Sequence, residues 1–169
     1  MSTLQHLHLP SSAGFHDAIS SKLSLRAGIL AGLVGSVAVI IVVTAAVLTA
    51  GEDIWIAPRT IASVFFGDNA MTGFFPVIVG TIMHFVTGAL EGAIFALILP
   101  RLPRAFWIVA GLIYGVAAWV VASFALLPEI APIMTSIEGY GSVLLIGHVA
   151  FGLVLGLFGA TYGLYFVEK

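Results

Sequence analysis

The sequence predicts an all-α membrane protein, a bundle of four transmembrane helices. Of the 169 residues, 60% are hydrophobic and only 8% are charged, whereas about 25% of an ordinary soluble domain is charged. The apolar residues gather in four runs, and each run is long enough to cross a bilayer as a helix, which takes about 20 residues. Glycines recur at helical spacing in every run, a pattern typical of helices that pack closely in lipid.

The chain divides into an N-terminal tail, residues 1–24, and a membrane domain, residues 25–169. We expect the tail to be either a short amphipathic segment at the membrane surface or an unstructured end, on the cytoplasmic side. It carries His6, His8 and His16, and the pair His6–His8 alone has too few ligands to predict a metal site. Cysteine is absent, which excludes disulfides, thiolate metal sites and cysteine nucleophiles.

The first span is expected at 27–50, a run without any charged residue. The loop after it predicts a short interfacial helix that has Pro58 in its first turn and runs through Phe66, because proline suits a first helical turn and Gly67 can end the helix. Trp55 and the phenylalanines of this loop suit the bilayer interface, where aromatic rings collect.

The other three spans are expected at 74–99, 105–127 and 142–167. Residues 100–104 contain two prolines and two arginines, and they predict a tight basic turn because proline does not continue a helix easily. Residues 128–141 form the last loop, which is acidic.

The basic residues predict the orientation of the bundle. Lys22, Arg26, Arg101 and Arg104 flank the first span and the second loop, whereas the first and third loops hold Arg59 alone beside several carboxylates. Positive segments stay in the cytoplasm. We therefore expect a multi-pass protein of the bacterial cytoplasmic (inner) membrane, with both termini in the cytoplasm, and four spans satisfy that parity.

Small-residue faces predict where the helices meet, because glycine lets two backbones approach closely. The glycines expected at helix contacts are Gly28, Gly32, Gly35, Gly88, Gly92, Gly111, Gly115, Gly152, Gly156, Gly159 and Gly163. The second and fourth spans share the spacing H-x3-G-x3-G, the first and third share G-x3-G, and each following loop contains Ile-Ala-Pro. These matches indicate two parallel helix–loop–helix repeats.

The candidate functional residues are His84, His148 and Glu91. Glu91 is the only carboxylate inside an apolar run, and an ionisable group in a membrane helix is costly and marks a candidate site. In one interpretation the three residues are structural, with the histidines bonded to neighbouring helices and Glu91 protonated, bonded to a helix end or bonded to a partner subunit.

Two alternatives remain open. His84 and His148 could be axial ligands of haem b or of a chlorophyll-type pigment, with the nearby glycines clearing space for the macrocycle. Glu91 could serve a proton or small-solute conduit. A single metal ion held by all three residues is disfavoured, because Glu91 lies about 10 Å along the helix from His84.

Nothing in the sequence predicts an enzyme. G-x-S-x-G, H-E-x-x-H and glycine-rich phosphate loops are absent, and there is no basic cluster of the kind that binds nucleic acid. We therefore expect a non-enzymatic structural or accessory subunit in the lipid bilayer. Its glycine-rich helix faces would dock on a larger membrane assembly or, by self-association, on copies of the chain.

The chain resembles a family of small, uncharacterised bacterial membrane proteins with four spans. The resemblance covers roughly 56–163, and three stretches carry it: GTIMHFVTGALEGAIFALILPRLP, GLIYGVAAWVVASFALLP and GHVAFGLVLGLFGATYG. The resemblance implies a four-span fold and a membrane location. It implies no established activity and assigns no role to Glu91.

Overall fold

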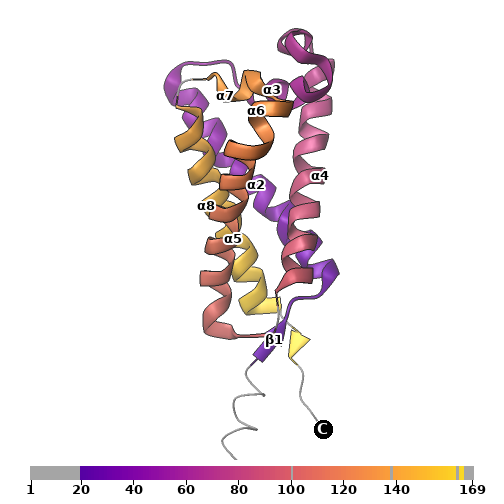
Figure 1. The fold of residues 1–169 in the computed structure, drawn as a ribbon, viewed down its shortest axis with the longest axis vertical. Coiled ribbons are helices and arrows are strands. Elements are labelled where there is room, and N and C mark those ends of the chain that lie inside the picture. Colours follow the sequence, from indigo (N-terminus) through magenta and orange to yellow (C-terminus); the bar gives the residue numbers. More distant parts are fainter. Residues whose placement is uncertain (1–19, 100, 138, 163, 166–169) are drawn as a thin grey trace, which may run out of the picture.

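The computed structural model describes residues 20–99, 101–137, 139–162 and 164–165. Four segments are long and apolar enough to cross a membrane: Leu25–Ala50, Phe75–Ile98, Arg104–Ile130 and Tyr140–Tyr162. The fold class is confirmed, since these segments form an all-α bundle of four membrane helices (Figure 1). The three tail histidines and Gly163 lie outside the described residues.

The helices pack as a row. Helix α2 (Leu25–Ala50) packs on α4 (Phe75–Ile98) and on α8 (Tyr140–Tyr162), and α8 also packs on α5 (Trp107–Val121). Figure 1 shows α2 crossing the bundle obliquely, from beside α4 near the sheet end to beside α8 at the other end. Backbone packing between α4 and α5 is sparse by comparison in the described residues. These two helices are therefore the ends of the row.

Aromatic side chains fill the space between α4 and α5. The Phe95 ring lies edge-on to the rings of Trp107 and Tyr114, with centroid distances of 6.0 and 5.1 Å. Phe95 and Trp107 are both fully buried. Edge-to-face contacts of this kind stabilise a pair of rings beyond the area they bury, so bulky rings join the two ends of the row where glycines are absent.

Local signals set the helix ends. The Ser24 hydroxyl accepts a hydrogen bond from the backbone N–H of Ala27, 3.2 Å away, and so caps the start of α2. Gly51 ends α2 in the left-handed conformation, with φ at 73°. At the end of α4, Leu99 is extended, as expected for a residue that precedes a proline.

The third span is longer than the expected 105–127 and is not a uniform α-helix. A short 3-10 turn η2 (Arg104–Phe106) leads into α5, and a π-helical segment η3 (Ala122–Leu126) joins α5 to α6 (Leu127–Ile130). The widened turn lies directly before Pro128 in the sequence, and proline has no N–H to donate to the preceding turn. This irregularity therefore has a local cause in the sequence.

Short helices gather at one end of the bundle (Figure 1). They are α3 (Ile56–Phe66), η1 (Gly67–Met71), α6 and α7 (Pro132–Thr135). The short helix expected in the first loop is confirmed as α3. The expected acidic loop 128–141 instead contains the end of the third span, α7 and the start of α8.

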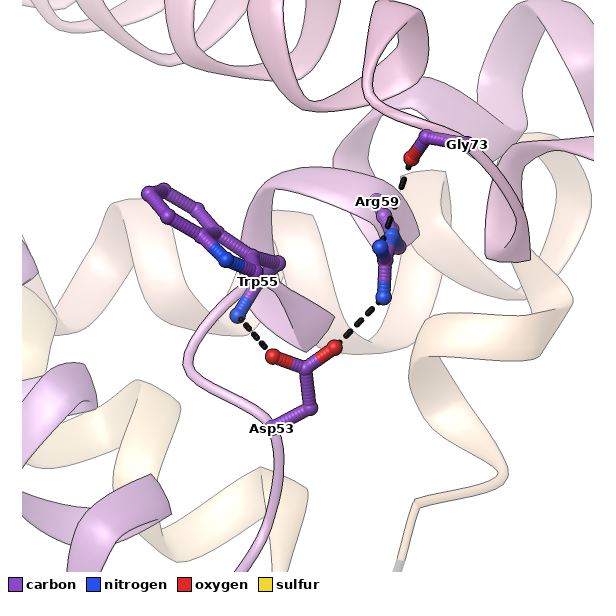
Figure 2. A network of polar contacts seen from close by, with 4 residues as sticks. All are labelled: Asp53, Trp55, Arg59 and Gly73. Atoms are coloured by element: carbon purple, nitrogen blue, oxygen red, sulfur yellow. Dashed lines mark hydrogen bonds and ion pairs between the residues drawn. The ribbon is translucent and has the colours of Figure 1, made fainter.

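One polar network holds the first loop together (Figure 2). The Asp53 carboxylate accepts a hydrogen bond from the backbone N–H of Trp55 at 3.1 Å and pairs with Arg59 Nη1 at 2.5 Å. Arg59 Nη2 donates to the carbonyl oxygen of Gly73, 3.3 Å away. Arg59 thus ties the residues before α3 to the residues before α4.

The opposite end carries a small antiparallel sheet that the sequence analysis did not predict. Strand β1 (Ser20–Lys22) lies between β2 (Leu102–Pro103) and β3 (Leu164–Tyr165). The expected fourth span, 142–167, is therefore wrong at its end: α8 stops at Tyr162, because the next described residues pair their backbone with β1. After β1, Leu23 is buried in the core of the bundle.

Large apolar side chains cover the outside of all four spans. Ile41 on α2, Leu97 on α4, Ile113 on α5 and Ile146 on α8 have exposed fractions of 64%, 64%, 65% and 57%. A water-soluble protein rarely exposes apolar surface this extensively, so the surroundings of the bundle are lipid.

Candidate functional site in the membrane-spanning helices

Glycines form the contact between α2 and α4. A Cβ atom added at Gly32 would overlap the carbonyl oxygen of Gly88, and one added at Gly28 would lie 2.5 Å from the carbonyl oxygen of Gly92. Side chains of any size would therefore push the two backbones apart. Ser36 continues the same spacing in α2, and its hydroxyl occupies the space beside Gly88.

A second glycine contact joins α5 to α8. Cβ atoms added at Gly111 and Gly152 would each overlap the carbonyl oxygen of the other residue, and one added at Gly115 would overlap the carbonyl oxygen of His148. Gly156 lies against the backbone of Trp107 and Ile108. The two ends of the row are thus each joined to an inner helix through glycine.

Two of the expected contact glycines face side chains instead of backbone. Gly35 does not share the partner of Gly28 and Gly32, because it lies against the Phe151 ring of α8. Gly159 lies under the indole of Trp107. In these places glycine makes room for a large ring of the neighbouring helix.

Gly80, which lies where the short helix α3 packs on α4, is not among the glycines that the sequence predicts at helix contacts. A Cβ atom at Gly80 would overlap the carbonyl oxygen of Pro58. The signal was present in the sequence, since Gly80 precedes His84, Gly88 and Gly92 at the same spacing of four residues. The small-residue face of α4 therefore extends from the membrane interior to the loop.

His84 makes a hydrogen bond across the α2–α4 contact. Its Nε2 lies 3.0 Å from the backbone carbonyl oxygen of Ser36, and the ring is half-buried. A carbonyl oxygen only accepts, so Nε2 carries the proton that is donated. The Ser36 hydroxyl in turn donates to the carbonyl oxygen of Gly32 at 3.0 Å. His84, Ser36 and Gly32 thus form one hydrogen-bonded network at the contact between the two helices.

His148 bonds differently. Its Nδ1 lies 2.9 Å from the carbonyl oxygen of Leu144, one turn earlier in the same helix α8. The same reasoning places the donated proton on Nδ1. Within the described chain no hydrogen bond joins His148 to His84, so the two imidazoles bond to different helices. His148 Nε2 makes no hydrogen bond with the described residues.

Glu91 and Tyr114 lie together between the ends of the row. The Tyr114 hydroxyl donates to the backbone carbonyl oxygen of Glu91 at 3.0 Å, which links α5 to α4. The Glu91 side chain is partly exposed, and among the residues that the structure describes its carboxyl group has no hydrogen bond and no ion pair. Glu91 therefore differs from both histidines, whose rings are bonded within the chain.

The three candidate residues do not form a metal site. Across residues 20–165, apart from the gaps noted above, no group of three or more His, Asp or Glu side chains comes together. His84 bonds toward α2, His148 bonds along α8, and Glu91 lies on the side of α4 that faces α5.

Comparison with known proteins shows which family the chain belongs to. The model of a family of unknown function, DUF6789, matches residues 24–164. The chain belongs to this family. DUF6789 thus covers all four spans of the protein. No curated protein and no solved structure matched the chain. Membership of DUF6789 therefore assigns no reaction and no ligand to the four-span domain.

Proposed function

We propose that the protein is a non-enzymatic subunit of a larger membrane assembly and that it docks through the side of the bundle where α4 and α5 meet. One observation carries this proposal: the Glu91 carboxyl is partly buried inside a span and has no partner in the described chain. A carboxyl group in hydrocarbon is unfavourable unless a partner bonds to it. A neighbouring transmembrane helix with a hydrogen-bond donor or a cation would provide that partner.

The glycine faces support this choice of surface by elimination. Their spacing in the sequence predicts that they dock the partner, but the chain's own helices occupy them: Gly32 meets Gly88, and Gly111 meets Gly152. The side of α4 around Glu91 is different, because Thr87 and Ile94, one turn on either side of it, are exposed. A partner helix could approach there without disturbing the bundle.

The proposed setting is a bacterial inner membrane, with both termini in the cytoplasm. Its support is that Lys22, Arg26, Arg101 and Arg104 all belong to the end that carries the sheet, and the positive-inside rule favours a cytoplasmic position for such an end. The two repeats are also a proposal. Their support is that His84-x3-Gly88 and His148-x3-Gly152 both contribute glycine to a contact with the span before them.

The test is the native mass of the assembly and its dependence on Glu91. The full chain is extracted from its own membranes in a mild detergent, and its mass is measured by size exclusion with light scattering. We expect a complex heavier than the 17.7 kDa chain, which Glu91→Leu reduces to the free bundle. Because leucine suits hydrocarbon, the variant should stay folded.

Two controls complete this test. Glu91→Gln keeps a hydrogen-bonding group and should retain part of the complex, and Glu129→Gln removes an exposed carboxylate elsewhere and should change nothing. A wild-type chain that is always monomeric, or a Glu91→Leu variant that keeps its full partner, would refute the proposal.

A second candidate function is the binding of a single pigment or haem at His148. Its Nδ1 donates to Leu144, which leaves Nε2 as the nitrogen with a free lone pair. Ligating histidines are commonly oriented by such a bond from the other ring nitrogen. Joint ligation by His84 is less well supported, because His84 Nε2 bonds to Ser36. A visible absorption band of the purified protein that disappears in His148→Ala would favour this candidate.

A further inference from the structure

The end of the bundle that carries the sheet is strongly basic. Of the described Lys and Arg residues, four lie there, namely Lys22, Arg26, Arg101 and Arg104, and only Arg59 lies at the other end. The described carboxylates show the opposite distribution. Glu52, Asp53, Asp68 and Glu129 belong to the end with the short helices, and Glu91 lies inside a span.

The sheet brings these basic residues together from separate parts of the chain. Ser21 pairs with Leu102, and Ser20 pairs with Pro103. One step further in the same register, Lys22 is level with Arg101, and Arg104 follows directly after β2. Lys22 and Arg101 are about 80 positions apart in the sequence. The pairing of β1 with β2 is therefore what brings the basic residues of the two segments together.

The basic side chains also face outward. Lys22, Arg26 and Arg104 are exposed, and in the described residues none of the three pairs with a carboxylate. Arg101 differs from the other three because it makes a contact of its own. We call Lys22, Arg26 and Arg104 the basic rim.

Apolar surface begins directly beside the basic rim. Leu25 begins α2, Ile98 ends α4 and Phe106 directly precedes α5; their exposed fractions are 47%, 61% and 59%. Positive charge next to exposed apolar surface matches the shape of a phospholipid, which has an anionic phosphate above its acyl chains.

We propose that the basic rim binds the phosphate of an anionic phospholipid, whose acyl chains lie along the exposed ends of α2, α4 and α5. Lys and Arg near an anionic lipid surface each contribute attraction that corresponds to roughly fivefold in binding. The three residues together favour an anionic headgroup over a zwitterionic one by roughly a hundredfold. The basic rim shares no residue with the docking surface proposed around Glu91, so either proposal can fail without the other.

The same phosphate chemistry could come from a soluble anion, and the experiment separates the two sources. The full chain, purified in detergent, is mixed with equal amounts of phosphatidylglycerol and phosphatidylcholine, and native mass spectrometry measures which lipid stays bound. A parallel sample contains inorganic phosphate in excess. We expect retention of phosphatidylglycerol, no displacement by phosphate, and loss of retention in 1 M salt, where the Debye length falls to about 3 Å.

The variants assign the binding to the rim. The triple variant K22Q/R26Q/R104Q should lose the preference for phosphatidylglycerol, whereas Arg59→Gln, which removes a positive charge at the other end, should keep it. K22R/R104K keeps both charges and should also keep the preference. If the triple variant does not fold, the three single variants and the salt titration of the wild-type chain give the same readout.

Three outcomes would overturn the inference. They are an unchanged lipid preference in the triple variant, an equal loss in Arg59→Gln, and complete displacement of the lipid by inorganic phosphate.

Discussion

The Nε2 of His84 lies 3.0 Å from the backbone carbonyl oxygen of Ser36, so one imidazole joins α4 to α2 at the point where glycines bring the two helices together. The hydrogen bond depends on the close backbone contact. Gly32 and Gly88 let the two helices approach closely enough for the ring to reach the carbonyl group. This contact gives the most direct predictions about stability.

Replacement of Gly32 by alanine should destabilise the bundle. The new Cβ would overlap the carbonyl oxygen of Gly88, and overpacking of a tight contact typically costs about 1–3 kcal/mol. The measurement is the free energy of unfolding in mixed micelles. Gly141→Ala is the matched control, since a Cβ there has open space. Equal stability of the two variants would contradict the helix contact.

Loss of the His84 side chain should have a smaller effect. Hydrogen bonds between membrane helices contribute about 0.6 kcal/mol on average, so we expect His84→Leu to lower the free energy of unfolding by that amount. His84→Gln carries an amide donor and should lose less than His84→Leu. If both variants unfold alike, the bond to Ser36 does not contribute to stability.

The pairing of the small sheet can be tested with an engineered disulfide, because the chain has no cysteine of its own that could form a competing bond. Ser21 and Leu102 are paired residues of β1 and β2. Opposite Cα atoms in antiparallel strands are about 4.5–5.5 Å apart, within the range that a disulfide bridges. S21C/L102C should therefore cross-link under mild oxidation, as a shift in gel mobility that reductant reverses. S136C/L102C joins opposite ends of the bundle and should stay reduced, and a cross-link there would argue against the fold.

Much of the fold could be predicted from the sequence, because lipid imposes simple rules. Four apolar runs predict four spans, and the spacing of Gly28 and Gly32 predicts a close helix contact that the structure places against Gly92 and Gly88. Pro58 and Gly67 predict the helix α3 in the first loop. These signals are local, so they can be read without knowledge of the tertiary structure.

The features that the sequence analysis missed depend on contacts between distant residues. Strands β1 and β3 are only three and two residues long, too short for alternating polarity to reveal them, and each forms because its partner comes from far along the chain. The sequence also does not reveal which residue a polar side chain forms a hydrogen bond with. His84 was singled out by its type, but its bond to Ser36, and the position of Tyr114 beside Glu91, follow from helix rotation.

The most direct test of the docking account places a photo-cross-linking amino acid at Ile94, one turn from Glu91 on α4. Ile41 on α2, which is also exposed, serves as the control position. Illumination of native membranes should join the probe at position 94 to one protein, Glu91→Leu should abolish that product, and the probe at position 41 should yield only lipid adducts. Lipid adducts alone at position 94, or a protein product that Glu91→Leu leaves unchanged, would contradict the account.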